Sequence, residues 1–273
     1  MKPYIPTSRN SSFELLRIIA MLAIIAHHYL VHGVGQIALA PPVLWSVGEI
    51  CQLLAKISNN IFFLLTGWFL CRTHFTFKRL MILFGQILFI NWSLLIINLV
   101  VYGQRDIVTI LKQLFPISSS MNWFISAYFA VYMLGSFIQN AAKYFRSNPR
   151  KYNIFISALF ILFGLIGFIT PSTAYYSRIA FGIYIVFIGD YVEFNKDKIS
   201  SLPVKMIGLV CFIILMGLRY ALDYIAEFIP VISDYAGHFE GNSSPLITTT
   251  AICVLLLFSK LSIKSKIINL LAS

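Results

Sequence analysis

Arginine and histidine side chains stand in an apolar segment near the start of the chain, where they could carry out acid–base or anion-binding chemistry. The segment ELLRIIAMLAIIAHHYL contains Arg17, His27 and His28 among mostly aliphatic residues. An imidazole titrates near neutral pH and can exchange a proton with a substrate, whereas a guanidinium keeps its charge and binds phosphates with several donors. Because an ionisable side chain inside a bilayer costs several kcal/mol, these residues are candidates for a functional site.

The spacing of these residues places two of them on one face of a helix. Arg17 and His28 lie within about 20° of each other around the helix axis and about 16 Å apart along it. Glu14 lies near the same face, whereas His27 points about 80° away. We expect this face to line the interior of a bundle or a water-filled cavity. Alternatively, Glu14 and Arg17 pair near the membrane surface, and His28 is a neutral residue that hydrogen-bonds a neighbouring helix.

A second polar face follows in the segment GEICQLLAKISNN. Polar side chains recur there every three to four residues, as expected for one face of a helix, at Glu49, Gln52, Lys56 and Asn59 or Asn60. Because a lysine this far from either end of a span cannot easily reach water, the face needs partners inside the bundle, and the first polar face is the expected one. We expect Glu49 and Lys56 to form a network that orders the helices, in preference to direct catalysis by Lys56.

The composition predicts that these helices belong to an integral membrane protein. The chain has 273 residues, of which 59% are hydrophobic and only 11% charged, with a mean hydropathy of +0.82. Soluble domains are about one quarter charged, so this composition excludes an ordinary soluble domain. We therefore predict an all-α, polytopic membrane bundle that forms a single domain over residues 1–273. The four scattered cysteines indicate neither a metal site nor a disulfide framework.

Eight apolar segments approach the length that a membrane span requires, which is about 20 residues. They cover residues 13–34, 43–70, 79–102, 121–140, 152–170, 174–193, 203–223 and 245–259. Most of the 21 lysines and arginines fall before the first segment or after the second, fourth, sixth and eighth. The loop over residues 224–244 has none. This alternation predicts that both termini are cytoplasmic, and it explains the net charge of +11 without a nucleic-acid partner.

Several of these segments resemble the acyltransferase-3 family of integral membrane acyltransferases. The most specific likeness is in FELLRIIAMLAIIAHHYL, where an arginine, ten other residues and a histidine stand in the first helix. The likeness continues in IFFLLTGWFL, NWFISAYFAVYML and FIGDYVEF, and it covers essentially the whole chain. Relatives in this family continue into further helices, so the resemblance implies a chain that lacks the last helices.

The resemblance implies transfer of an acyl group, usually acetyl from acetyl-CoA, to a hydroxyl of a cell-surface or exported carbohydrate. It implies a multi-pass protein of the bacterial plasma membrane that works without a metal. By matched position, His28 is the expected catalytic residue, either as general base or as transient acyl carrier. Arg17 is expected to steer the anionic CoA or to orient the histidine. Arg72, Lys78 and Arg79 form the expected landing site for CoA phosphates, unless they are ordinary cytoplasmic charges.

Two other functions stay open from the sequence. A transporter or flippase for a glycan precursor would also have polar helix faces around a central cavity, although the chain shows no inverted repeat. A truncated remnant without activity would keep the same motifs. Acetyl transfer that depends on His28 separates the acyltransferase from both.

Overall fold

The computed structural model describes residues 10–30, 42–71, 75–103, 105–119, 122–169, 178–235 and 237–271. All regular secondary structure in these residues is helical, which confirms the all-α prediction. The long helices are α1 (Ser11–His28), α2 (Pro42–Leu70), α3 (Phe77–Val100), α9 (Arg178–Phe194), α11 (Val204–Phe228) and α12 (Pro245–Ser259). The shorter ones are α4 (Ile107–Leu114), α5 (Trp123–Met133), α6 (Gly135–Arg146), α7 (Pro149–Leu159), η3 (Phe160–Leu165), α8 (Ile166–Ile169), α10 (Lys196–Ile199), η5 (Pro230–Tyr235), η6 (His238–Glu240) and α13 (Lys266–Leu271).

Six helical segments in the described ranges are long and apolar enough to cross a membrane, which fits a polytopic bundle. They are Ser11–His28, Trp45–Leu70, Phe77–Val100, Pro149–Ile169, Val204–Phe228 and Pro230–Ser259, the last of which comprises η5, η6 and α12 and includes residue 236, outside the described ranges. The expected count of eight is not confirmed. The expected sixth span corresponds to α9, which has 17 residues over its described length.

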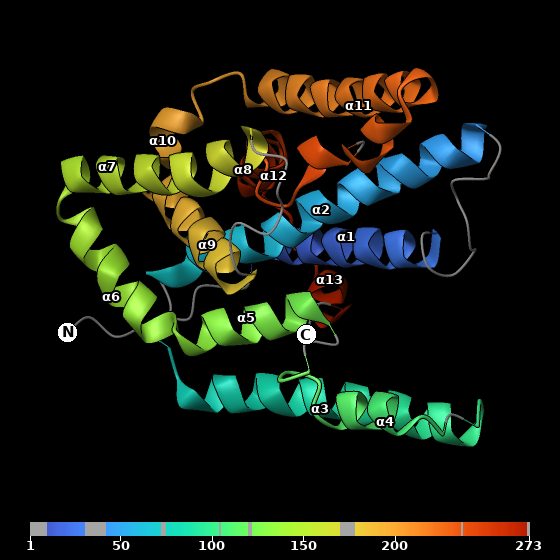
Figure 1. Cartoon of the computed structure of the whole chain (residues 1–273). Helices are drawn as coiled ribbons and strands as arrows, with labels where there is room; N and C mark the ends of the chain where they lie inside the picture. The colour runs from blue at the N-terminus through green and yellow to red at the C-terminus, as the bar shows by residue number, and fades with distance from the viewer. Residues whose placement is uncertain are drawn as a thin grey trace.

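The expected fourth span, residues 121–140, is two helices instead of one. Helix α5 ends at Met133, and α6 begins at Gly135 with a new direction (Figure 1). The apolar run ends near this break, because α6 carries Gln139, Lys143 and Arg146. A helix with these side chains is poorly suited to the hydrocarbon region, so the chain turns there.

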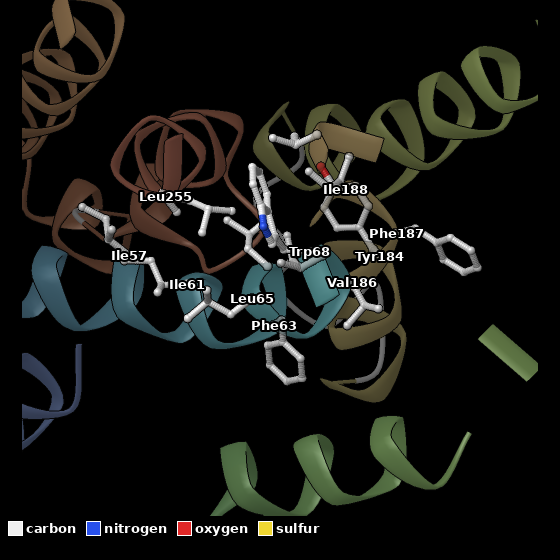
Figure 2. Packing of buried hydrophobic residues seen from close by; sticks show 14 of the residues in the cluster. Ile57, Ile61, Phe63, Leu65, Trp68, Tyr184, Val186, Phe187, Ile188 and Leu255 are labelled. Atoms are coloured by element: carbon white, nitrogen blue, oxygen red, sulfur yellow. The ribbon is translucent and has the colours of Figure 1, made fainter. Parts of the chain in front are cut away.

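Helices α2 and α9 form the centre of the molecule. Figure 2 shows Trp68 of α2 beside Val186 of α9, whereas Ile61 lies farther along α2, on the side of Leu255 of α12. The two backbones approach closely because Gly67 has no side chain there, and a Cβ atom at this position would collide with the carbonyl oxygen of Val186. Small residues at such crossings are typical of helix packing in membranes.

The remaining helices surround this centre. Helix α1 lies along α2, α12 packs on α2 and α11 packs on α12, whereas α3 and α4 lie on the opposite side of the bundle (Figure 1). Most of the large apolar side chains of α3 are exposed, as expected for a surface that faces lipid.

The start of α1 is fixed to both neighbouring parts of the chain. Phe13 packs on Trp68 and Phe69 near the end of α2, with ring centroids 5.8 and 5.2 Å away. The Ser12 hydroxyl donates to the Leu261 carbonyl at 2.8 Å. Helix α1 is therefore antiparallel to α2, and its histidines lie toward the end of the bundle where α2 begins.

Candidate active site

A cavity of about 360 Å³ lies between α1, α2, the start of α5 and the loop before α12. Its polar lining comes from all four parts: His27 and His28 of α1, Lys56 and Asn59 of α2, Asn122 and Trp123 at the start of α5, and Asn242 of the loop. The arrangement combines two groups that can exchange protons, one ammonium group, three carboxamides and an aromatic face. It can bind a polar substrate and move a proton on it.

Both histidines of α1 line this cavity. His28 is exposed and His27 is half-buried, and their rings lie 5.3 Å apart. The sequence placed only His28 on the polar face of the helix. The cavity reaches His27 as well, because it extends around the end of α1 toward α5 and Asn122.

Arg17 lies at the other end of α1, apart from the cavity. Its Nη1 atom donates to both carboxylate oxygens of Glu14 at 2.9 Å, while 38% of the Arg17 side chain is exposed. Glu14 itself is buried. The structure thus contains the pairing that the sequence left as one alternative, and it does not bring Arg17 and His28 together.

The polar face of α2 finds its partners on α11 and η6. The Lys56 ammonium lies 3.0 Å from Glu240 Oε2, and Gln52 Nε2 donates to the same oxygen at 3.0 Å. Glu49 lies 3.3 Å from Arg219 Nη2. The expected partner, the polar face of α1, meets this face of α2 at the cavity, which His28 lines together with Lys56 and Asn59. The prediction of a network that includes Glu49 and Lys56 agrees with these contacts.

Sequence reasoning missed Glu240 and Arg219. Glu240 is buried, with 1% of its side chain exposed, and Arg219 also donates from Nε to Asp223 at 2.7 Å. The only signal in the sequence is that Lys56 needs a carboxylate, and this does not say which acidic residue supplies it. Two acidic residues follow α11, Asp234 and Glu240, and only the fold selects Glu240.

The loop that carries Asn242 is fixed to α2 by carboxamide side chains. Asn60, which is fully buried, donates from Nδ2 to the Asn242 carbonyl at 2.8 Å. Asn59 Nδ2 lies 3.4 Å from Asn242 Oδ1. These contacts hold the loop in place as one wall of the cavity.

The expected CoA-binding residues lie at the other end of the bundle. Lys78 and Arg79 are exposed in the first turn of α3, and Arg79 hydrogen-bonds Tyr132 of α5. Arg72 lies outside the described residues. Because Phe13 packs on Trp68 and Phe69, Arg17 lies at the same end of the bundle as the connection between α2 and α3.

A second buried charge network joins α6, α7 and α9 at this end. Arg146 donates to Asp190 at 2.7 and 3.1 Å and to Glu193 at 2.7 Å, and the Tyr152 hydroxyl donates to Asp190 at 2.9 Å. Burial, together with the negative charge of Asp190, raises the pKa of the Cys71 thiol to about 12. Asp190 is fully buried and has all these partners, so the network is a structural clamp between helices.

Among the residues with described positions, no group of three or more histidine, cysteine, aspartate or glutamate side chains is placed to hold a metal ion. Comparison of the whole chain with protein families gives a match to the acyltransferase 3 family model, described as an acyltransferase domain, over residues 10–273. No curated protein and no solved structure that was compared matches the chain.

Proposed function

The chain belongs to the acyltransferase 3 family of membrane acyltransferases, and we propose that it transfers an acetyl group from acetyl-CoA to a hydroxyl of an exported carbohydrate. One observation supports this most: His28, the histidine that matches the family's motif, lines a cavity that is large enough for a substrate group and that several polar side chains share with apolar ones. The acyl donor and the carbohydrate acceptor are the substrates, and the bilayer is the protein's environment.

The imidazole of His28 acts as the general base in this proposal. A sugar hydroxyl holds its proton far above neutral pH, so it attacks a thioester efficiently only when a base takes the proton during attack. His28 accepts this proton and returns it to the sulfur of the departing CoA. In the alternative course, His28 first accepts the acetyl group itself and then passes it to the hydroxyl.

Arg17 and the basic residues around the start of α3 hold the CoA phosphates. Arg17 and His28 are about 16 Å apart along α1, so the two side chains cannot both contact the same reacting atom. Acyl-CoA, however, carries its thioester at the end of a long pantetheine arm, well away from its phosphates. Arg17, Lys78 and Arg79, which lie at one end of the bundle, bind the phosphates together with Arg72, while the thioester reaches the cavity.

The other cavity residues suit a carbohydrate acceptor. The carboxamides of Asn59, Asn122 and Asn242 offer planar donors and acceptors for hydroxyl groups, and Trp123 offers an aromatic face. By the distribution of basic residues, this cavity opens toward the outer face of a bacterial plasma membrane, where exported polysaccharide is found.

Labelled acetyl transfer tests this function. Membranes that contain the chain are incubated with acetyl-CoA labelled in the acetyl group, and label in the polysaccharide is measured after removal of small molecules. The proposal expects label in ester linkage, released by mild alkali. A glycan that crosses the membrane without gaining label would support a transporter and contradict the proposal.

A further inference from the structure

We propose that Lys56 is a second catalytic residue of the cavity and that Glu240 is the positioning residue that holds its ammonium group there. The inference rests on the proposed function and adds to it. His28 removes the proton of the attacking hydroxyl, whereas Lys56 stabilises the negative charge that develops on the carbonyl oxygen of the acyl group.

An ion pair holds the Lys56 ammonium in place, but part of the Lys56 side chain stays accessible. Its ammonium lies 3.0 Å from Glu240 Oε2, and 24% of the Lys56 side chain is exposed. The exposed part faces the cavity that His28 also lines. An ammonium group has three donors, and Glu240 is its one hydrogen-bond partner within the described parts of the chain, so donors are left for a ligand in the cavity.

Glu240 is suited to fixing this group in place. Its side chain is 1% exposed, and Gln52 Nε2 holds the same oxygen that accepts from Lys56. Arg219 approaches that oxygen at 3.8 Å and is itself paired with Glu49 and Asp223. The carboxylate therefore has little freedom to move, and the direction from which Lys56 reaches the cavity is set in advance.

A pair that served only to join helices would not need a partly exposed lysine at a cavity that two histidines also line. The network around Arg219 already links α2, α11 and η6 through Glu49 and Glu240. Lys56 adds a positive charge on the cavity side of this network. A positive donor that is already oriented when charge develops is among the most effective ways to stabilise a transition state.

The proposed step is balanced in atoms and electrons. The hydroxyl oxygen bonds to the acyl carbon, its proton passes to the His28 imidazole, and the carbonyl electron pair moves onto the oxygen that faces Lys56. When the carbonyl re-forms, the carbon–sulfur bond breaks and the CoA sulfur takes the proton from the imidazolium. Lys56 donates a hydrogen bond throughout and keeps its own protons.

A set of four variants tests the inference in the labelled-acetyl assay at varied acetyl-CoA concentration. Lys56→Met removes the charge and leaves Glu240 with only the more distant Arg219 as a cation, Lys56→Arg keeps a charge, and Glu240→Gln removes the positioning carboxylate. Lys56→Met combined with Glu240→Gln removes both charges, so no buried charge is left unpaired. Lys205→Met, at an exposed position in the first turn of α11, is the control for loss of a lysine.

We expect Lys56→Met to lower the maximal rate by about 100-fold to 1,000-fold, with much less effect on the half-saturating acetyl-CoA concentration. We expect the double variant to be as slow as Lys56→Met although its melting temperature returns toward that of the wild type, and Lys56→Arg to be faster than Lys56→Met. Recovery of the double variant to within about threefold of the wild-type rate would overturn the inference, because the pair would then be structural only. A wild-type chain that transfers no label would overturn the proposed function itself.

Discussion

Some side chains in this protein contact residues that are close in the sequence, whereas others contact residues that only the fold brings near. Glu14 and Arg17 are three residues apart on one helix, so their pairing could be anticipated from spacing. Lys56 and Glu240 are 184 residues apart, and their contact depends on the way the loop before α12 folds back onto α2. Spacing also separated His27 from His28, yet both line the cavity, because a cavity of this size reaches more than one side of a helix end.

The raised pKa of the Cys71 thiol predicts that this residue reacts slowly with alkylating reagents near neutral pH. Burial first, and then the charge of Asp190, raises this pKa to about 12, so almost no thiolate is present near neutral pH. In a chain whose other three cysteines are replaced by serine, alkylation of Cys71 by iodoacetamide should be slow at pH 8. Its rate should still rise about tenfold per pH unit between pH 8 and 10. A rate that levels off near pH 9, as for an ordinary exposed thiol, would contradict this environment.

A few contacts at the beginning of α1 determine where this helix places its histidines. The beginning of α1 is fixed by Ser12 and Phe13, whereas its last turns, which carry the histidines, border the cavity. The apolar periodicity of the sequence located the long helices well. It did not locate the break at Leu134, because the residues on both sides of it are apolar and the polar side chains of α6 begin only a few residues later.

The close crossing of α2 and α9 predicts that a side chain larger than that of Gly67 destabilises the protein. Gly67→Ala should destabilise the protein by about 1–3 kcal/mol, because the new methyl group meets the backbone of α9 and cannot be accommodated by a side-chain movement. Gly217→Ala in α11 is the matched control, since a Cβ atom there meets no other atom within 4 Å. It should be neutral or stabilise the helix by less than about 1 kcal/mol. Thermal unfolding in lipid nanodiscs measures both, and equal effects of the two changes would argue against the close crossing.

The whole molecule has two chemically different ends. At one end, the starts of α1 and α3 and the end of α2 bring Arg17, Lys78 and Arg79 to the same region, and Lys260 after α12 contacts the Ser200 carbonyl at 3.0 Å. At the other end, His28, Asn122 and Asn242 border the cavity. Composition was enough to predict a helical membrane protein. The expected count of eight spans is not confirmed, because α5 and α9 are apolar but have only 11 and 17 residues over their described lengths.

The distribution of lysines and arginines predicts which end faces the cytoplasm. In a chain without native cysteines, Ser201→Cys lies near the basic end and Ser118→Cys lies in the connection between α3 and α5, and both positions are exposed. A maleimide that does not cross membranes should label the Ser118→Cys variant in intact cells and the Ser201→Cys variant only after the cells are opened. The reverse pattern would invert the topology and place the cavity on the cytoplasmic side.

The most direct test of the central claim compares the two neighbouring histidines in the labelled-acetyl assay. His28→Ala and His27→Ala are expressed at matched levels in the membrane, and acetyl transfer to polysaccharide is measured for each beside the wild-type chain. We expect His28→Ala to lower transfer by at least about 100-fold and His27→Ala to stay within a few-fold of the wild type. Transfer that survives in His28→Ala, or that is lost only in His27→Ala, would contradict the assignment of His28 as the catalytic residue.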